Sequence, residues 1–214
     1  MMMALRPLIP VMTILLLLAG PHPTQAADAQ IARATVQAAV DDGLTTFLGQ
    51  THSLPERARL LDGLLRRYTD PTMLAASLLG RHWGKITPAE QAAFTDTFMR
   101  YLVSSYVGLL KNIQPGVKVD IGEAVDQGSR VKVASIAYLP SQPGAPVPVE
   151  WDVATTADGK PVLMDVTAEG VSIIRAMRED FASVLRGSGG RIDPLMEALR
   201  RKIDANDKDN VAGQ

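Results

Sequence analysis

Few side chains in this sequence have the types and spacing that an active site requires. Asp165 and Glu169 lie four positions apart in an alternating segment, so both point to the same side of a predicted strand. Such a pair can act as general acid and general base, but two carboxylates also occur on any solvated sheet face. We favour the solvated face, and we therefore predict no catalytic residues and no enzymatic activity.

Metal and cofactor sites are also not indicated. The chain has no cysteine, and beyond its first 26 residues the only histidines are His52 and His82, which form no HExxH motif. The glycine-rich segment 187–190 lies between two predicted helices, whereas a phosphate-binding loop would follow a strand. We expect no metal site and no cofactor.

A basic side on one predicted helix is the next candidate. The helix expected over residues 54–68 carries four arginines, at Arg57, Arg59, Arg66 and Arg67. A solvated helix face explains them, and a docking surface for a partner is the alternative. The net charge of the whole chain is −1, which argues against nucleic acid because counterion release needs a basic excess.

The first 26 residues have the features of an export signal. Arg6 provides a positive charge, and the apolar run that follows, at roughly 12 residues, is too short to span a bilayer. Thr24-Gln25-Ala26 forms a small-x-small cleavage site, so we predict a signal peptide over residues 1–26, with an uncleaved anchor as the alternative. An exported chain without cysteine indicates the periplasm of a Gram-negative bacterium.

Hydrophobic periodicity divides the remaining chain into helices, strands and helices again. Helices are predicted over 28–48, 54–68, 73–83 and 88–112, and Thr87-Pro88-Ala89-Glu90 has the pattern of a capping box. Period-two alternation predicts strands at 117–121, 131–133, 147–153 and 162–168. A helix that ends near Leu185 and another over 192–203 follow, and the polar residues 204–214 are expected to be a disordered tail.

This order predicts a single α+β domain over residues 27–203. Strands so close together in sequence pair as a four-stranded antiparallel meander with one apolar and one polar face. Helices from both ends of the chain must cover the apolar face. With 46% hydrophobic but only 5% aromatic residues, the interior has to be mainly aliphatic.

The remaining candidate residues for function are apolar side chains that face the predicted interface between sheet and helices. They come from the near-continuous apolar run Leu74–Leu79, the long helix predicted over 88–112, the predicted strands and the predicted helix after Gly170. Periodicity alone favours a packed core over a cavity. The set is Leu78, Leu79, Trp83, Phe94, Phe98, Tyr101, Leu102, Val119, Val133, Val149, Trp151, Val153, Met164, Val166, Val171, Ile174, Met177 and Phe181.

Several motifs in this order point to one family. They are Leu78-Leu79-Gly80-Arg81-His82-Trp83, Thr87-Pro88-Ala89-Glu90-Gln91 with Phe94 and Phe98, Tyr106, Asp165-Val166, Glu169-Gly170-Val171-Ser172, and Arg178 with Phe181. Together they resemble the phospholipid-binding proteins of the Mla (maintenance of lipid asymmetry) system, also called the toluene-tolerance auxiliary family. The segments Pro161-Val162-Leu163-Met164 and Trp151-Asp152 depart from the residues common in that family.

The resemblance implies a soluble periplasmic carrier of phospholipid. Such proteins hold acyl chains in a hydrophobic pocket between sheet and helices, and move lipid between an outer-membrane lipoprotein–porin complex and an inner-membrane ABC transporter. The apolar residues above would line that pocket. Two acyl chains hold about 30 methylenes, and at ~0.8 kcal/mol each their exposure would cost roughly 24 kcal/mol, so a carrier needs an apolar pocket.

Two alternatives stay open at this stage. The cargo could be another apolar lipid, such as a hopanoid. The protein could also be a periplasmic scaffold whose apolar side chains simply fill its core.

Overall fold

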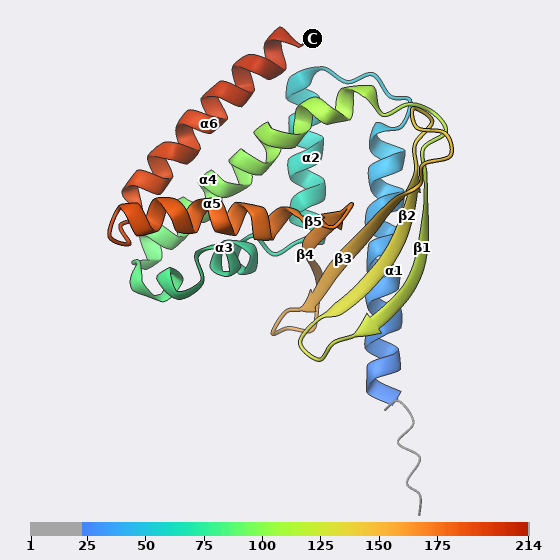
Figure 1. The fold of residues 1–214 in the computed structure, drawn as a ribbon, viewed down its shortest axis with the longest axis horizontal. Coiled ribbons are helices and arrows are strands. Elements are labelled where there is room, and N and C mark those ends of the chain that lie inside the picture. The colour runs from blue at the N-terminus through green and yellow to red at the C-terminus, as the bar shows by residue number, and fades with distance from the viewer. Residues whose placement is uncertain (1–22, 214) are drawn as a thin grey trace, which may run out of the picture.

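The computed structural model describes residues 23–213, and Figure 1 shows their fold. Helices α1 (Pro23–Phe47), α2 (Leu54–Tyr68), α3 (Pro71–Leu79) and α4 (Pro88–Tyr106) come first, with 3₁₀ turns η1 (Gly80–Lys85) and η2 (Val107–Asn112) after α3 and α4. The strands follow, and helices α5 (Ile173–Gly187) and α6 (Asp193–Ala212) end the chain. Most of the predicted signal peptide lies outside the described residues, so it stays a prediction.

The sheet has five antiparallel strands in sequential order, where four were predicted. They are β1 (Lys118–Asp126), β2 (Val131–Tyr138), β3 (Val147–Thr155), β4 (Pro161–Ala168) and β5 (Val171–Ser172). The fifth strand has only two residues, too few to show a period. Glu169 and Gly170 make the reversal that precedes it, with φ angles of 51° and 81°.

Helix α1 covers one face of the sheet and runs behind the strands in Figure 1. Ala32, Val36 and Val40 are buried against sheet residues that include Val133. The Arg33 guanidinium fixes this helix by donating hydrogen bonds of 2.9 Å to the carbonyls of Ile121 and Gly122. Both carbonyls belong to the edge strand β1, at the point where its register with β2 shifts.

The opposite face of the sheet is polar on β2 and much of β3, as the alternation predicted, whereas Ala154 and Val162 on this face are buried among side chains of helices α3–α6. Lys132 pairs with Glu150, and Arg130 lies 3.7 Å from Asp152, both across β2 and β3. Charged pairs on neighbouring strands keep such a face in contact with water.

Side-chain caps mark the starts of three helices, and the predicted capping box is one of them. The side chains of Ser53, Asp70 and Thr87 cap α2, α3 and α4, and the Thr87–Glu90 capping box is present. Two predicted helices are each divided. Gly80, with a φ of 51°, ends α3 before the turn η1, and the continuation of α4 tightens into η2.

The C-terminal helices lie differently from the prediction. They pack on α3 and α4 beyond the β4–β5 edge, and only the beginning of α5 reaches the sheet. The apolar face of the sheet is therefore covered mainly from the N-terminal side of the chain. The buried residues form two clusters where one mixed core was expected: a helical cluster of α3–α6 with part of β4, and a sheet cluster of α1 with the strands.

The predicted disordered tail is also wrong for most of its length, because α6 continues to Ala212. Asn206 donates to the hydroxyls of Ser104 and Ser105 at 3.2 and 3.1 Å, and Asn210 donates to the Ser104 carbonyl at 2.8 Å. These amides bond α6 to α4, so a polar sequence forms an ordered helix. Among residues 23–213, no helix has the length and apolarity needed to cross a membrane.

Candidate binding cavity

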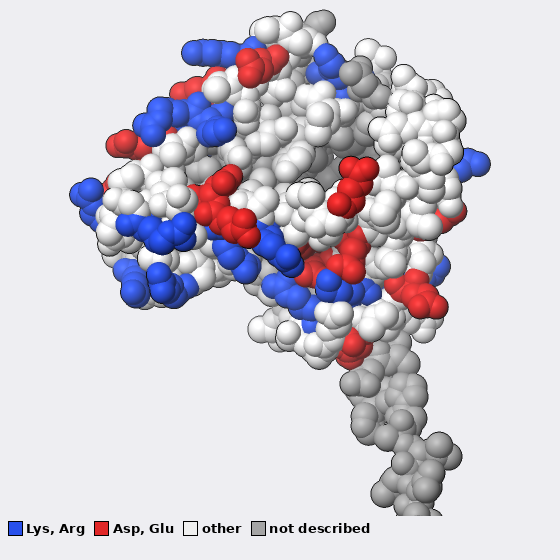
Figure 2. Space-filling model, viewed as in Figure 1, with Lys and Arg blue, Asp and Glu red and all other residues white. Residues whose placement is uncertain are grey.

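An apolar cavity of about 250 Å³ lies where the helical cluster meets the sheet cluster. Helices α2, α3 and α4 form one side, strands β3 and β4 the other, and the start of α5 closes one end. Figure 2 shows the surface hollowed between α4 and the strands, where few charged side chains lie. The lining residues are Leu61, Leu65, Thr69, Leu74, Leu102, Tyr106, Trp151, Leu163, Met164, Asp165, Val166, Ile173 and Ile174.

The cavity exists because strand β4 contributes to both clusters. A register shift between β3 and β4 at Asp152–Val153 interrupts the regular alternation of side chains. The shift pairs Leu163 with Val153 and Val166 with Trp151, so two β4 side chains three positions apart share the α1 face, while Val162 and Met164 pack with the helices. The two clusters diverge on either side of β4, and the space between them is walled by aliphatic side chains.

Asp165 is the charged residue of the lining, and its carboxylate serves the backbone. It accepts hydrogen bonds from the backbone N–H groups of Val166 at 2.8 Å and Ile174 at 3.0 Å, and from the Ser172 hydroxyl. Ser172 in turn caps α5 by accepting from the N–H of Arg175 at 2.9 Å. The carboxylate therefore fastens the start of α5 to β4.

Glu169, the other member of the predicted carboxylate pair, lies exposed in the reversal before β5. Asp165 thus has a structural role that Glu169 does not share, and the described structure contains no hydrogen bond between the two side chains. Within the part of the chain that the structure describes, no group of three histidine, aspartate or glutamate side chains comes together as a metal site.

Tyr106 brings a second polar group to the cavity. Its hydroxyl has no hydrogen-bond partner among the described residues, and burial, followed by the nearby Tyr101 and Asp165, raises its pKa above the ordinary value. Trp151 differs, because its indole N–H donates to the Ser135 hydroxyl at 2.8 Å. The cavity wall is therefore almost without free polar groups, as an apolar ligand requires.

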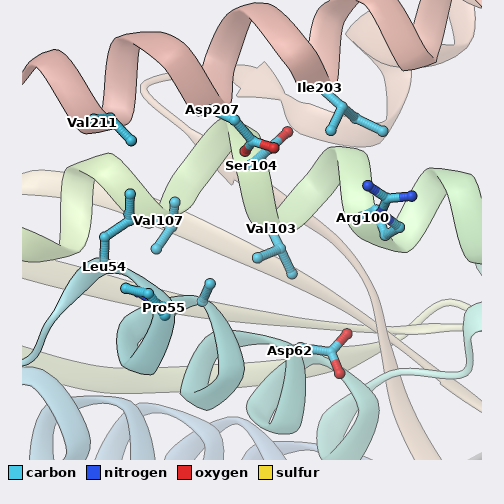
Figure 3. Close-up of a pocket in the computed structure, with 11 residues that line it drawn as sticks. Leu54, Pro55, Asp62, Arg100, Val103, Ser104, Val107, Ile203, Asp207 and Val211 are labelled. Carbon is cyan, nitrogen blue, oxygen red and sulfur yellow. The ribbon is translucent and has the colours of Figure 1, made fainter.

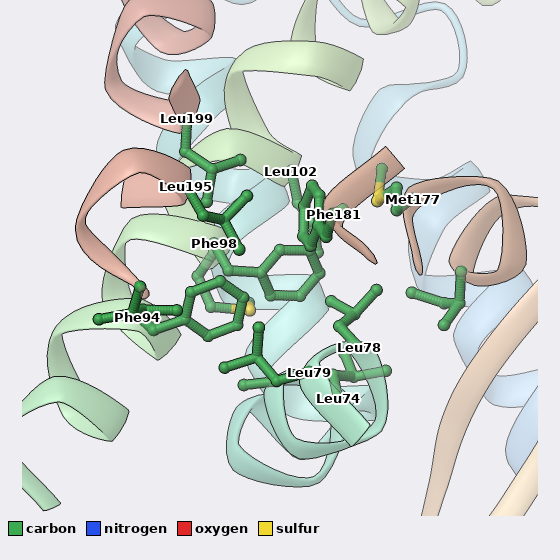
Figure 4. Packing of buried hydrophobic residues seen from close by; sticks show 14 of the residues in the cluster. Leu74, Leu78, Leu79, Phe94, Phe98, Leu102, Met177, Phe181, Leu195 and Leu199 are labelled. Atoms are coloured by element: carbon green, nitrogen blue, oxygen red, sulfur yellow. The ribbon is translucent and has the colours of Figure 1, made fainter. Parts of the chain in front are cut away.

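Five of the predicted site residues line the cavity: Leu102, Trp151, Met164, Val166 and Ile174. Many of the others fill the helical cluster. The rings of Phe94, Phe98 and Phe181 pack with centroids 6.2 to 6.4 Å apart, and Figure 4 shows them surrounded by leucines. Tyr101, Trp83, Leu78, Leu79 and Met177 belong to the same cluster.

The predicted strand residues mostly face α1. Val119, Val133 and Val153 pack in the sheet cluster, and Val149 is half-buried on β3. Val171 is 64% exposed in β5, so it lies on the surface and away from the cavity.

Sequence reasoning missed Leu61 and Leu65 on α2 as cavity residues. They lie four positions apart on one face of a strongly amphipathic helix, which is a signal that could have identified them. Leu163 and Ile173 could not have been found in this way. Their positions depend on the strand register shift and on the abrupt start of α5.

The four arginines of α2 have four different environments. Arg66 pairs with Asp62 at 2.9 Å, Arg67 pairs with Asp42 of α1 at 2.7 Å, and Arg59 is exposed. Arg57 is only 9% exposed, and its Nε has no hydrogen-bond partner. The prediction of a solvated face is therefore wrong for Arg57.

Asp42 connects α1 to α2. It accepts hydrogen bonds from the Tyr68 hydroxyl at 2.6 Å and from Arg67 at 2.7 Å. The Tyr68 bond first, and Arg67 second, hold the pKa of Asp42 below its ordinary value. Since α2 forms one wall of the cavity, this contact helps to hold that wall against α1.

A separate groove of about 370 Å³ lies on the outside of the helical layer, between α2, α4 and α6. Figure 3 shows Val103 on α4 and Ile203 on α6 in its lining, together with the charged groups of Asp62, Arg100 and Asp207. It shares no lining residue with the cavity. These charged groups in its lining make it a poorer place for hydrocarbon.

The chain matches a known protein family and is similar to a solved structure. A family model described as "MlaC protein" matches residues 35–201, which include all elements that line the cavity. Among solved structures, the chain is similar to a phospholipid-binding protein from Ralstonia solanacearum in complex with a phospholipid. The TM-score is 0.71 at 25% sequence identity, over 82% of this chain and 98% of the other. The chain belongs to the MlaC protein family.

Proposed function

We propose that this protein is a phospholipid carrier that holds acyl chains in the cavity between its helical cluster and its sheet cluster. The observation that carries the proposal is the apolar cavity at the junction of two separate clusters, in a chain of this family. The similar Ralstonia solanacearum protein binds a phospholipid, which supports the same class of ligand here.

The energetics of the cavity suit a carrier. An acyl chain with about 15 methylenes would cost roughly 12 kcal/mol to expose to water, at ~0.8 kcal/mol per methylene. An aliphatic wall removes most of this cost and offers few polar groups that the ligand would leave unsatisfied. Transfer of the lipid from a bilayer to such a cavity then changes its free energy little, and binding needs no covalent chemistry.

The arrangement of the clusters gives a way to enlarge the cavity. The cavity of about 250 Å³ receives part of one acyl chain. A second chain requires the helical cluster to move away from the sheet, and the incoming hydrocarbon would replace the contacts that are lost. Met164 suits such a position because its flexible side chain adapts to a changed neighbour.

We further propose that the carrier acts in the periplasm, after removal of the signal peptide. Its partners there would be an inner-membrane ABC transporter complex and an outer-membrane lipoprotein–porin complex. Membership of the MlaC protein family supports this part of the proposal. The protein would serve as the lipid-binding shuttle between the two membranes, without enzymatic activity.

The proposal is tested by lipid extraction from protein produced in a Gram-negative host. We expect phospholipid to co-purify and to be detected by mass spectrometry of the organic extract. Val166→Trp, which fills the cavity, should reduce the lipid severalfold. The matched control is Val125→Trp on β1, where the valine is 53% exposed, and it should keep its lipid.

The result also separates the alternatives. A hopanoid in place of phospholipid would change the cargo but keep the carrier. An extract without lipid from folded wild-type protein would contradict the proposal and favour a scaffold with a filled core.

A further inference from the structure

Arg57 is a buried cation for which the described residues supply no counter-ion. Only 9% of the residue is exposed, and its Nε is buried without a hydrogen-bond partner. Its guanidinium forms no hydrogen bond or ion pair with the side chains that the structure describes, which exclude those of residues 23–27 and 112. By contrast, Arg66 and Arg67 of the same helix pair with carboxylates, and Arg59 is exposed. A buried charged group without a partner is unfavourable, so burial of the Arg57 charge requires a compensating interaction.

The electrostatic field of the helix does not stabilise the positive charge of Arg57 either. Ser53 caps α2, so Arg57 follows directly after the first turn of the helix. The N-terminal end of a helix carries partial positive charge, and it favours anionic side chains such as Glu56 over cations. An arginine there is disfavoured both by burial and by the helix, unless an anion approaches it.

Arg57 is not itself among the residues that line the cavity, but it lies on the face of α2 that supplies two of them. Leu61 and Leu65 line the cavity from this helix. Arg57 lies one turn before Leu61 and two turns before Leu65, and residues four apart share one helix face. The face that supplies two cavity leucines therefore carries the unpaired guanidinium at its N-terminal end.

We propose that Arg57 binds the phosphodiester group of the phospholipid whose acyl chains occupy the cavity, an inference that rests on the proposed function. The guanidinium presents N–H donors in a planar fork that matches two phosphate oxygens. Bound in this way, the phosphate supplies the missing counter-ion. The lipid lies with its phosphate at the N-terminal end of α2 and its hydrocarbon along Leu61 and Leu65.

This contact also gives the cavity a basis for selection. Diacylglycerol has the same two acyl chains and no phosphate, so it can fill the apolar space but leaves Arg57 unpaired. Loss of a hydrogen bond to a charged group lowers binding roughly 10- to 100-fold. The protein therefore prefers phospholipid to a neutral lipid with identical chains.

The test uses delipidated full-length mature protein and vesicles that contain equal amounts of dioleoyl phosphatidylglycerol and dioleoylglycerol. Mass spectrometry of the re-isolated protein gives the ratio of the two bound lipids. We expect wild type to favour the phospholipid at least about tenfold, Arg57→Gln to lose most of that preference while it still takes up dioleoylglycerol, and Arg59→Gln to match wild type. Arg57→Lys, which keeps the charge without the fork, should be intermediate.

Other outcomes overturn the inference in distinguishable ways. If Arg57→Gln keeps the wild-type ratio, or loses both lipids equally, Arg57 does not bind phosphate. If wild type takes up neither lipid, the carrier function itself is wrong. Arg57→Met, which retains an apolar stem of similar length, replaces the glutamine variant if that variant does not fold.

Discussion

Removing the Asp165 carboxylate should loosen the junction that shapes one end of the cavity. In Asp165→Ala, the Ser172 hydroxyl and the Ile174 N–H lose their acceptor. Ser172 is buried, at 7% exposure, so water replaces the carboxylate poorly. The N-cap of α5 and the cavity wall made by Ile173 and Ile174 then lose their common attachment to β4.

The size of this effect follows from the two bonds that reach Ser172 and Ile174, because the third bond, from the Val166 N–H, stays within β4. A hydrogen bond to a charged group contributes about 1.5 to 3 kcal/mol, and the lower figure applies because Asp165 itself is half-buried. Two such bonds give a loss of about 3 kcal/mol in the free energy of unfolding. For a domain of this length, that corresponds to a fall in Tm of roughly 6 to 12 °C.

Urea unfolding followed by far-UV circular dichroism measures the change, with Asp152→Ala as the control. Asp152 lies directly opposite Asp165 on β3, but its only ion pair in the described structure is the 3.7 Å contact with Arg130. We expect the control to lose less than about 1 kcal/mol, as surface pairs do. Equal losses in the two variants would refute the assignment of Asp165 as the residue that anchors α5.

Two further predictions concern the helices around the cavity. The lowered pKa of Asp42 means that its contribution to stability is present above the unfolded value near 3.8 and is lost as the pH falls through the lower folded value. Asp42→Asn should therefore lower stability at neutral pH and weaken the pH dependence of urea unfolding between about pH 2 and 5, and an unchanged pH profile would contradict the Tyr68–Asp42–Arg67 contact. Asn206→Ala removes the bonds to Ser104 and Ser105, so amide hydrogen exchange should accelerate in α6 beyond Ile203 while its first turns stay protected. Exchange in Asn206→Ala identical to wild type would show that these bonds do not hold the end of α6.

The sequence predicted those features that depend on neighbouring residues. The Thr87–Glu90 capping box and the polar sheet positions Glu150 and Asp152 follow from local chemistry and from strand alternation. The family resemblance, drawn from motifs in order, is confirmed by the match over residues 35–201.

Features that depend on tertiary packing were not predictable in this way. Nothing in the local sequence separates Phe98, which fills the helical cluster, from Leu102, which lines the cavity one turn later. The register shift at Asp152–Val153 decides which β4 side chains meet which cluster. Arg57 resembles its neighbouring arginines in sequence, and only the folded structure buries it.

The most direct test of the account is to locate the acyl chain in the folded protein. A phospholipid with a photoactivatable diazirine in the middle of one acyl chain is loaded into delipidated protein, irradiated, and mapped by peptide mass spectrometry. We predict that the label attaches to the cavity walls, at peptides that contain Leu61, Leu102 or Met164. Labelling confined to the outer groove of α2, α4 and α6, or to exposed positions such as Val171, would contradict the claim that the cavity holds the lipid.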